Sequence, residues 1–394
     1  MLVFWETTKA CKLVCKHCRA EAIEEPLPDE LTHEESLALI DQITEFGRPY
    51  PHLIMTGGDV LMRKDFWDLA RYSISKGIRT LVAPSVTPLL TEEKIKKMKE
   101  IGIIGMSLSL DGARAETHDS IRGINGIFER TVELMNFVKK DVGMFLQINT
   151  AVMRDNVEEL PEVFKLITDA GVDAWEVFYL ILTGRASKDL DLTKDEYWDV
   201  SNFLYDASKY GKTTIRTTEG PFFRVVYRLR TVLDEMGKGP EELGVGELYY
   251  KLRERLEELM GPVPHGPPKQ KRAPSAYTRD GYGIIFVAYN GDVYPSGFLP
   301  YKVGNVREAS LKEIYQNSKA LKMIRDPSNF RPPCGTCKFN FMCGGSRARA
   351  YSYFKDPFGH DPACKLPEVL ESLDPQVVEE ALRPFGRAKS FTNV

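Results

Sequence analysis

Short β-rich runs alternate with amphipathic helical patterns along residues 1–190 of the chain. The apolar runs predict six strands, at Leu2–Trp5, His52–Met55, Arg79–Ala83, Ile104–Ser109, Phe145–Val152 and Trp175–Leu182. Between them, apolar residues at helical spacing predict a helix opened by a capping box at Thr32 and Glu35, and further helices at Phe66–Ser75, Glu92–Glu100, Ile127–Lys139 and Val157–Ala170. Strands that alternate with helices form a parallel sheet with right-handed crossovers. Six such units favour an α/β fold with a partial (βα)6 TIM-like barrel over a closed barrel of eight.

The rest of the chain divides into three predicted regions. Residues 191–276 are interpreted as a helical linker that ends in a Pro-rich basic segment, Gly261–Ala276, typical of a surface linker, with a substrate-facing lid as the alternative. Residues 277–370 are interpreted as a small α+β domain that begins with a hairpin around Asn290-Gly291. Residues 371–394 form a tail with one helical stretch at Pro375–Leu382.

Composition narrows the class of protein. The chain has 394 residues, of which 43% are hydrophobic and 28% charged, as in a globular enzyme and unlike a collagenous or disordered chain. Its longest apolar run, about Val177 to Leu182, is far shorter than the roughly 20 residues that span a bilayer, and its start does not resemble a signal peptide. The net charge of −3 gives no global field that attracts nucleic acid or anionic lipid. We therefore expect a cytoplasmic protein without nucleic-acid or membrane partners.

Seven cysteines fall into two groups that lie at opposite ends of the chain. The first group is Cys11, Cys15 and Cys18, and the second is Cys334, Cys337, Cys343 and Cys364. An odd number of cysteines argues against a disulfide framework, which the cytosol also disfavours. Three plus four cysteines in two compact groups indicate metal ligation.

The first group lies in the loop after the first predicted strand, on the face where βα barrels build their active sites. Three thiolates are one too few for a closed zinc site or a fully protein-ligated cluster, so one metal position stays open. That opening favours catalysis; the alternative, a structural zinc knuckle that uses His17, has poor spacing. Thr56-Gly57-Gly58-Asp59 follows the second strand, where glycines let a ligand approach and a carboxylate can hold an ammonium group. Alone, this stretch is more typical of a turn than of a binding site.

Cys11-x3-Cys15-x2-Cys18 together with Gly57-Gly58-Asp59 resembles the radical S-adenosylmethionine (radical SAM) superfamily. The resemblance implies that the three cysteines hold a [4Fe–4S] cluster whose open iron binds the amino and carboxylate groups of SAM. It implies that one electron then cleaves SAM to a 5′-deoxyadenosyl radical, which abstracts a substrate hydrogen. Asp59 takes the place of the family's usual glutamate toward the amine, and His17 replaces an aromatic residue that stacks on adenine.

Further matches continue along the barrel. Ser109, in Ser-Leu-Asp-Gly at the end of the fourth strand, stands where the family contacts the SAM ribose. Arg122 stands where the resemblance implies a contact with the SAM carboxylate, and Gln147 on the fifth strand also fits the pattern. For each of these residues a structural hydrogen bond is the alternative interpretation. Ser85 replaces an asparagine that many relatives carry.

The second cysteine group can close a four-thiolate site, either for zinc or for an iron–sulfur cluster, and spacing alone leaves both open. The stretch resembles the SPASM/twitch extension of radical SAM enzymes, which carries auxiliary [4Fe–4S] clusters. Ser296 and Ser346 stand where the full pattern has cysteines for a second auxiliary cluster. The resemblance therefore implies two [4Fe–4S] clusters in all, one that binds SAM and one auxiliary cluster closed by its four cysteines.

Residues 4–370 resemble a subgroup that includes a heme b synthase and a heme d1 maturation enzyme. The resemblance implies tetrapyrrole side-chain modification, such as propionate decarboxylation, with reduced ferredoxin or flavodoxin as electron donor. Arg185, Arg347 and Arg349 are then candidate cations for the substrate, or else structural side chains. One alternative is a SPASM-type maturase that modifies a peptide or protein, disfavoured because no leader-binding module precedes Leu2. Another is a non-enzymatic iron–sulfur electron carrier.

Overall fold

One ten-stranded sheet runs through the protein, whose computed structural model describes residues 1–268 and 278–383. The strands lie in the order β10-β9-β8-β1-β2-β3-β4-β5-β6-β7. From β1 to β7 every neighbouring pair is parallel. β10 and β7 are the two edges, so the sheet is open. A mostly parallel, open α/β sheet confirms the predicted fold class.

The strand bounds follow the apolar runs of the sequence to within a few residues. The strands are β1 (Leu2–Glu6), β2 (His52–Thr56), β3 (Thr80–Val82), β4 (Gly105–Ser109), β5 (Phe145–Val152), β6 (Ala174–Tyr179), β7 (Thr214–Thr218), β8 (Ile284–Val287), β9 (Asp292–Tyr294) and β10 (Gly304–Asn305).

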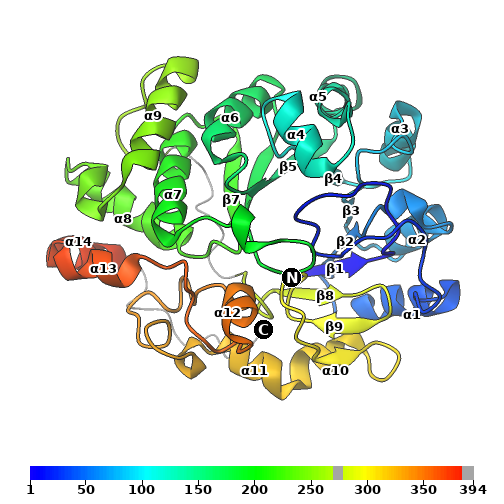
Figure 1. Cartoon of the computed structure of the whole chain (residues 1–394). Coiled ribbons are helices and arrows are strands. Elements are labelled where there is room, and N and C mark those ends of the chain that lie inside the picture. The colour runs from blue at the N-terminus through cyan, green and yellow to red at the C-terminus, as the bar shows by residue number, and fades with distance from the viewer. Residues whose placement is uncertain (269–277, 384–394) are drawn as a thin grey trace.

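Helices cover the outside of the curved sheet, as Figure 1 shows. The α-helices are α1 (His33–Thr44), α2 (Phe66–Ser75), α3 (Glu92–Glu100), α4 (Ala115–Arg122), α5 (Ile127–Phe137), α6 (Leu160–Asp169), α7 (Lys194–Ser208), α8 (Phe223–Glu235), α9 (Glu247–Met260), α10 (Leu311–Asn317), α11 (Lys319–Arg325), α12 (Arg347–Phe354), α13 (Leu366–Ser372) and α14 (Pro375–Leu382). The predicted capping box at the start of α1 is confirmed, because Thr32 accepts from Glu35 N and the Glu35 carboxylate accepts from Thr32 N.

The structure adds a seventh parallel strand to the six that the sequence predicts. β7 lies within residues 191–276, which the sequence interprets as a helical linker, and it pairs with β6 from Ala174↔Thr214 to Phe178↔Thr218. Its sequence, TIRTT, contributes a single buried residue, Ile215, so its apolar pattern is too weak to mark a strand. Residues 191–276 therefore contain a strand in addition to the expected helices, which are α7, α8 and α9.

The C-terminal region extends the same sheet on the side of β1. β8 pairs in parallel with β1, from Leu2↔Ile284 to Trp5↔Val287. β9 returns antiparallel to β8 after the turn at Asn290-Gly291, and β10 pairs with β9. The C-terminal strands thus lie directly beside the strand that leads into the first cysteine group.

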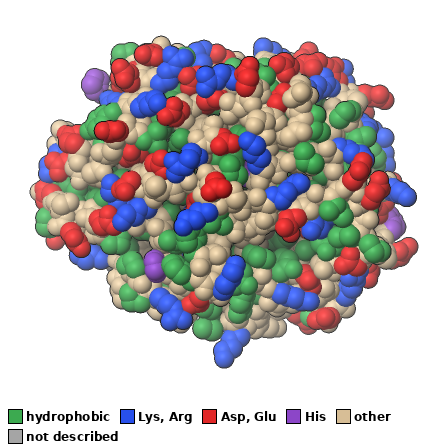
Figure 2. Space-filling model, in the orientation of Figure 1, with side chains coloured by type: hydrophobic (Ala, Val, Ile, Leu, Met, Phe, Trp, Pro, Cys, Tyr) green, Lys and Arg blue, Asp and Glu red, His purple; other side chains and the backbone are tan. Residues whose placement is uncertain are grey.

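Buried aromatic side chains fix the sheet to its helices. Trp5 on β1, Trp175 on β6 and Trp198 on α7 are all fully buried. Burying a side chain of this size contributes roughly 1.5–3 kcal/mol. Cations and carboxylates are interspersed over the face seen in Figure 2. None of the described helices is both long and apolar enough to cross a membrane.

The domain boundaries at residues 190, 276 and 370 stay predictions. Residues 269–277, in the Pro-rich basic segment, and residues 384–394 of the tail lie outside the described residues. The helix predicted in the tail is confirmed as α14.

Candidate active site

The loop that follows β1 carries the first cysteine group and closes on itself before α1. Cys11 N donates to Ile23 O at 2.8 Å, which draws the two ends of the loop together. Cys11, Cys15 and Cys18 all line one cavity of about 210 Å³, at the carboxyl ends of the parallel strands. The face that the sequence predicts for an active site therefore carries three thiols around a single space.

Gly57 and Gly58 follow β2 and pack against the backbone of the cysteine loop. Gly58 N donates to Thr8 O at 2.8 Å, and a Cβ on Gly58 would lie only 2.4 Å from Ala10 O. Both glycines and Thr56 line the cavity. The sequence predicts that these glycines admit a ligand; in the structure they also admit the backbone of the cysteine loop, because they have no side chain.

Asp59 lies behind these glycines rather than on the wall of the cavity. Its side chain is fully buried, Oδ1 accepts from Leu61 N at 3.1 Å, and Oδ2 accepts from Thr87 Oγ1 at 2.9 Å. Burial raises the pKa of the Asp59 carboxyl. Asp59 is absent from the described residues that line the cavity. A direct contact between its carboxylate and a ligand amine stays a prediction, and the observed bonds support a positioning role for Asp59.

Arg122, the last residue of α4, connects the end of β4 to the cysteines. Its Nη2 lies 2.5 Å from Asp111 Oδ2, and its Nη1 lies 3.6 Å from Cys15 Sγ. Asp111 is fully buried, and burial alone would raise its pKa, but the charge of Arg122, together with smaller contributions from the two neighbouring histidines and a backbone N–H, lowers the pKa below its usual value. The Asp111 carboxylate therefore stays ionised and holds the guanidinium against Cys15.

Two histidines complete this part of the cavity wall. His17 Nε2 lies 3.6 Å from Asp111 Oδ2, and His118 Nδ1 accepts from Asp111 N at 2.9 Å. Burial lowers the pKa of each histidine to about 4, so both are neutral at neutral pH. His17 Nδ1 and Arg122 Nε are buried and have no hydrogen-bond partner among the described residues. Unpaired polar atoms on a cavity wall are available to a polar ligand.

Two strands contribute polar side chains that the sequence identifies only in part. Ser109 at the end of β4 lines the cavity as expected. Gln147 on β5 is absent from the described lining; its Nε2 donates to Asn149 Oδ1 at 2.8 Å, and Asn149 lines the cavity instead. Residues two apart on a strand share a face, so Gln147 supports Asn149 from the side.

Part of the cavity wall consists of residues that the sequence did not identify as candidates. Arg19, Phe178 and Phe298 line the cavity together with the cysteines, and the rings of Phe178 and Phe298 lie 5.8 Å apart. The Arg19 guanidinium lies 4.6 Å from the ring centre of Phe286, and Nη1 donates to Glu6 at 3.1 Å. Arg19 directly follows Cys18, and that position is the one sequence signal that could have identified it.

The three candidate substrate cations lie in different surroundings. Arg185 N donates to Cys18 O at 3.0 Å, and its Nε and Nη2 are buried without a partner in the described part of the chain. The charge of Arg185 contributes to the low pKa of His17. Arg347 and Arg349 are buried in α12 and are absent from the residues described around this cavity, and their guanidinium groups bond to the protein. One of these bonds runs from Arg349 Nη2 to Leu180 O of the cavity wall, at 3.3 Å. Of the three, Arg185 is the one that bonds to the first cysteine loop, and a substrate contact by any of them stays a prediction.

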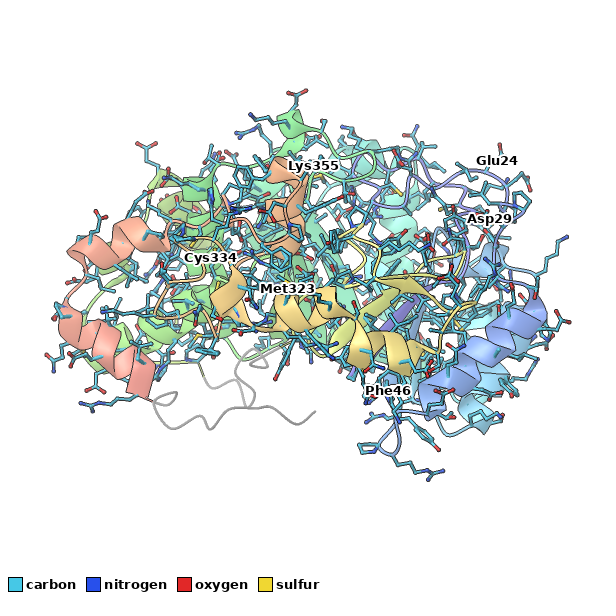
Figure 3. The ribbon with its side chains drawn as sticks, turned by 90° about the horizontal axis from the view of Figure 1, so that it is seen from below. Glu24, Asp29, Phe46, Met323, Cys334 and Lys355 are labelled. Carbon is cyan, nitrogen blue, oxygen red and sulfur yellow. The ribbon has the colours of Figure 1, made fainter. Side chains whose placement is uncertain are left out.

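The second cysteine group surrounds a small apolar recess. Its lining includes Cys334, Cys337, Cys343 and Cys364, together with Leu366 and two prolines. Burial raises the pKa of each of the four thiols. In Figure 3, Cys334 lies among the C-terminal segments, whereas Glu24 and Asp29, from the loop between the first cysteine group and α1, lie at the other end of the view.

The two serines that replace cysteines do not join this recess. Ser346 is the N-cap of α12; its Oγ accepts from Arg349 N at 2.9 Å and donates to the Glu219 carboxylate. Ser296 is buried, and its Oγ has no hydrogen-bond partner among the described residues. Neither serine is among the residues described around the recess.

Both cysteine groups fit the iron–sulfur clusters that the sequence predicts. Three thiols share the first cavity with the unpaired nitrogens of His17 and Arg122, an arrangement that suits a cluster with one open iron beside a polar ligand. Four thiols surround the second recess, an arrangement that suits a closed cluster. In residues 1–268 and 278–383, no group of three histidine, cysteine or carboxylate side chains forms a site for a single metal ion.

Comparisons with protein families match both parts of the chain. A family model described as the Radical SAM superfamily matches residues 5–175, and one described as an iron–sulfur cluster-binding domain, SPASM, matches residues 279–338. The first match contains the cysteine loop and the glycines, and the second contains two of the four later cysteines.

Curated relatives cover nearly the whole chain. An AdoMet-dependent heme synthase of Oleidesulfovibrio alaskensis is 34% identical over 92% of this chain and 86% of its own length. An AdoMet-dependent heme synthase of Methanosarcina barkeri is 33% identical over 92% of this chain and 95% of its own length. Among solved structures, Streptococcus suis SuiB bound to S-adenosylmethionine has a TM-score of 0.63 and 16% identity over 92% of this chain and 76% of SuiB. That structural likeness shows the fold alone.

Proposed function

The chain belongs to the radical SAM superfamily and carries an iron–sulfur SPASM domain, and from this membership we propose that it modifies tetrapyrrole side chains as a heme-type synthase. Membership makes it an enzyme that uses SAM and a [4Fe–4S] cluster, with an auxiliary iron–sulfur cluster in the SPASM domain. We assign the SAM-binding cluster to the first cysteine group and the auxiliary cluster to the second.

One observation carries the site assignment: a single cavity joins the three thiols to Arg122, His17 and an aromatic wall. When bound, the cluster and SAM would supply the radical chemistry that abstracts a hydrogen atom from the substrate. The chain binds and orients this pair. Arg122, fixed by Asp111, would hold the SAM carboxylate, while Ser109 and Asn149 would offer hydrogen bonds to its ribose. Neutral His17 would border the adenine, and the buried walls would exclude water from the reacting atoms.

The substrate assignment rests on the relatives and on the cavity wall. Two AdoMet-dependent heme synthases are 33–34% identical to the chain over almost its full length. We therefore assign iron-coproporphyrin as substrate. Each propionate would give up one hydrogen atom, release CO2 and pass one electron to an acceptor, for which the auxiliary cluster is available, and so become a vinyl group. Besides Arg122, Arg19 and Arg185 lie beside the first cysteine group, and each suits a substrate carboxylate. Phe178 and Phe298 suit an apolar macrocycle.

A reduced ferredoxin or flavodoxin is our proposed electron donor, because the cluster must receive electrons one at a time. We place the protein in the cytoplasm, because all seven cysteines are free thiols and reducing compartments preserve thiols.

The test is anaerobic reconstitution followed by an iron and sulfide count, then incubation with dithionite, SAM and iron-coproporphyrin. We expect about eight irons, from two clusters of four. We also expect 5′-deoxyadenosine and a porphyrin mass loss that corresponds to decarboxylation. Formation of 5′-deoxyadenosine with unchanged porphyrin would overturn the substrate assignment and favour the peptide alternative. A fully iron-loaded, reduced protein that leaves SAM intact would contradict the assignment of the cavity itself.

A further inference from the structure

A buried cation lies beside the second cysteine group. Arg347 is the first residue of α12, and its side chain is 0% exposed. It is absent from the residues described around the first cavity, where a substrate cation would be needed. A buried charge is costly unless it has a partner, so its surroundings call for an explanation.

Neutral groups hold most of the Arg347 guanidinium. Nε donates to Gly345 O at 3.2 Å, and Nη1 donates to Pro357 O at 3.2 Å and to Gly359 O at 2.5 Å. The guanidinium lies 4.1 Å from the ring centre of Phe330. Backbone carbonyls and a phenyl ring fix the position of the group, but none of them carries a formal negative charge.

The remaining nitrogen faces Cys334. Arg347 Nη2 is buried and has no hydrogen-bond partner among the described residues. A Cβ on Gly345 would lie 2.5 Å from this Nη2 and 3.0 Å from Cys334 Sγ, so both atoms border the same small space. The guanidinium is therefore close enough to act on the sulfur.

The neighbouring carboxylates are engaged elsewhere. Asp280 accepts from the backbone N–H groups of Arg347 and Ala348, at 3.1 and 3.3 Å. Asp361 pairs with Arg349 Nη1 at 3.3 Å, and its own backbone N–H donates to Cys334 Sγ at 3.3 Å. Cys334 thus faces one backbone donor and one cation, and no carboxylate among the described residues bonds to that guanidinium.

We propose that Arg347 is a positioning residue for the auxiliary cluster, and that its guanidinium, placed against Cys334, raises the reduction potential of that cluster. Four thiolates give a closed [4Fe–4S] cluster a net negative charge, and reduction adds one more. A fixed cation beside one sulfur stabilises the reduced form more than the oxidised form. The proposal rests on the assignment of the auxiliary cluster to the second cysteine group.

The experiment isolates the auxiliary cluster in a chain in which Cys11, Cys15 and Cys18 are replaced by Ala. Arg347→Gln removes the charge, and Arg347→Lys keeps a charge on a shorter, flexible side chain. Arg228→Gln is the matched control, because Arg228 also donates to backbone carbonyls, those of Glu380 and Ala381, from helix α8. Each protein is reconstituted anaerobically, its iron is counted, and its midpoint potential is measured by redox titration followed by electron paramagnetic resonance.

We expect Arg347→Gln to make reduction at least tenfold less favourable, a fall in midpoint potential of about 59 mV for one electron. The midpoint potential of Arg347→Lys should fall less, and that of Arg228→Gln should equal the parent value. An Arg347→Gln protein with about four irons and the parent potential would overturn the proposal. If Arg347→Gln does not retain iron, the proposal is tested on Arg347→Lys, whose Fe–S stretching frequencies are measured by resonance Raman spectroscopy. Frequencies shifted from those of the parent support the proposal, and unchanged frequencies overturn it.

These readouts separate the proposal from the proposed function. Turnover of a porphyrin is not measured, so a wrong substrate assignment leaves the potentials unaffected. The parent chain, without its first three cysteines, should bind about four irons. If it binds none, the auxiliary-cluster assignment is refuted before any Arg347 variant is compared.

Discussion

The guanidinium of Arg122 lies 3.6 Å from Cys15 Sγ and is held there by Asp111, 2.5 Å away. α4 ends at Arg122, and Gly123 follows it in a left-handed conformation, with Gly123 N donating to Asp119 O. The end of a helix and the end of β4 thus fix one cation at the first cysteine group. Its charge is permanent because arginine is not deprotonated in proteins.

Arg122→Gln should therefore weaken SAM binding strongly. The lost interaction is a hydrogen bond between charged groups, which contributes about 1.5–3 kcal/mol, so we expect the Kd for SAM to rise roughly 10- to 150-fold. Equilibrium binding to the anaerobically reconstituted protein measures this change. Arg130→Gln is the control, because Arg130 pairs with Glu133 on the surface of α5.

A structural collapse can be separated from lost binding. Arg122→Gln leaves the buried Asp111 carboxylate unpaired, which costs about 3–5 kcal/mol of stability. Adding Asp111→Asn removes that charge and should restore much of the free energy of unfolding while SAM binding stays weak. Recovery of parent SAM affinity in the double variant would refute a direct role for Arg122.

Replacing Cys11, Cys15 and Cys18 by Ala should abolish 5′-deoxyadenosine formation and leave about four irons on the protein, those of one closed cluster. The reason is that these thiols line a cavity separate from the recess of the second group. The complementary chain, without the four later cysteines, should also retain about four irons. Iron counts and product analysis check both chains; a first variant that still cleaves SAM would disprove the assignment.

Local signals made much of the fold predictable. Neighbouring residues alone specify the capping box of α1, the helix at Phe66–Ser75 and the turn at Asn290-Gly291. β7 was not predicted, because its residues are mostly polar and lie at an edge of the sheet. The pairing of β8 with β1 joins residues more than 280 positions apart, and no local pattern specifies such a partner.

The candidate site was predictable where a motif marks it and not where packing decides. The cysteines and glycines are recognisable by their spacing. Gln147 and Asn149 lie on the same face of β5, and the sequence does not show which of the two side chains reaches the cavity. Arg347 and Arg349 show the same limit. Their sequence context suggested substrate cations, yet both side chains are buried and donate to backbone carbonyls of the protein itself.

Asp59 offers a test of whether its carboxylate touches SAM. Because Oδ1 and Oδ2 bond to Leu61 and Thr87, Asp59→Ala should lower the free energy of unfolding by about 1–3 kcal/mol. Asp59→Asn keeps the shape and should retain most of the SAM affinity. Thermal unfolding and SAM binding measure the two effects. A loss of SAM affinity above about tenfold in Asp59→Asn, at unchanged stability, would instead show direct contact with the ligand.

Glu219 should make the stability of the protein depend on pH. Burial raises its pKa well above the ordinary value, the nearby Asp280 raises it further, and the bond from Ser346 and the charge of Arg349 oppose the shift. The folded state therefore binds a proton that the unfolded chain has released, so stability falls as pH rises from the unfolded pKa toward the folded one. Glu219→Gln should flatten this fall at pH values above the ordinary glutamate pKa of about 4.3, and the gain in stability should grow as pH rises. An unchanged slope in thermal unfolding would contradict a raised pKa at Glu219.

Gly58→Ala should disrupt the first cluster without affecting the second. A Cβ at this position would lie 2.4 Å from Ala10 O, a backbone atom that cannot move without shifting the cysteine loop. Overpacking of this kind costs about 1–3 kcal/mol, and here the strain falls directly on the residue before Cys11. We expect the variant to lose SAM cleavage and to retain about four irons, those of the second cysteine group.

Ser85→Ala gives the matched comparison, in the segment after β3 that also contacts Gly58. Ser85 Oγ donates to Gly58 O at 2.8 Å and lies 3.6 Å from Cys11 Sγ, so its loss removes a contact without adding a clash. It should cost about 0.5–1.5 kcal/mol and leave both clusters in place. Equal iron loss in the two variants would mean that the Ser85 bond, and not the close approach of Gly58 to Ala10, holds the cysteine loop. Full iron in Gly58→Ala would mean that the loop can move aside and still close around its cluster.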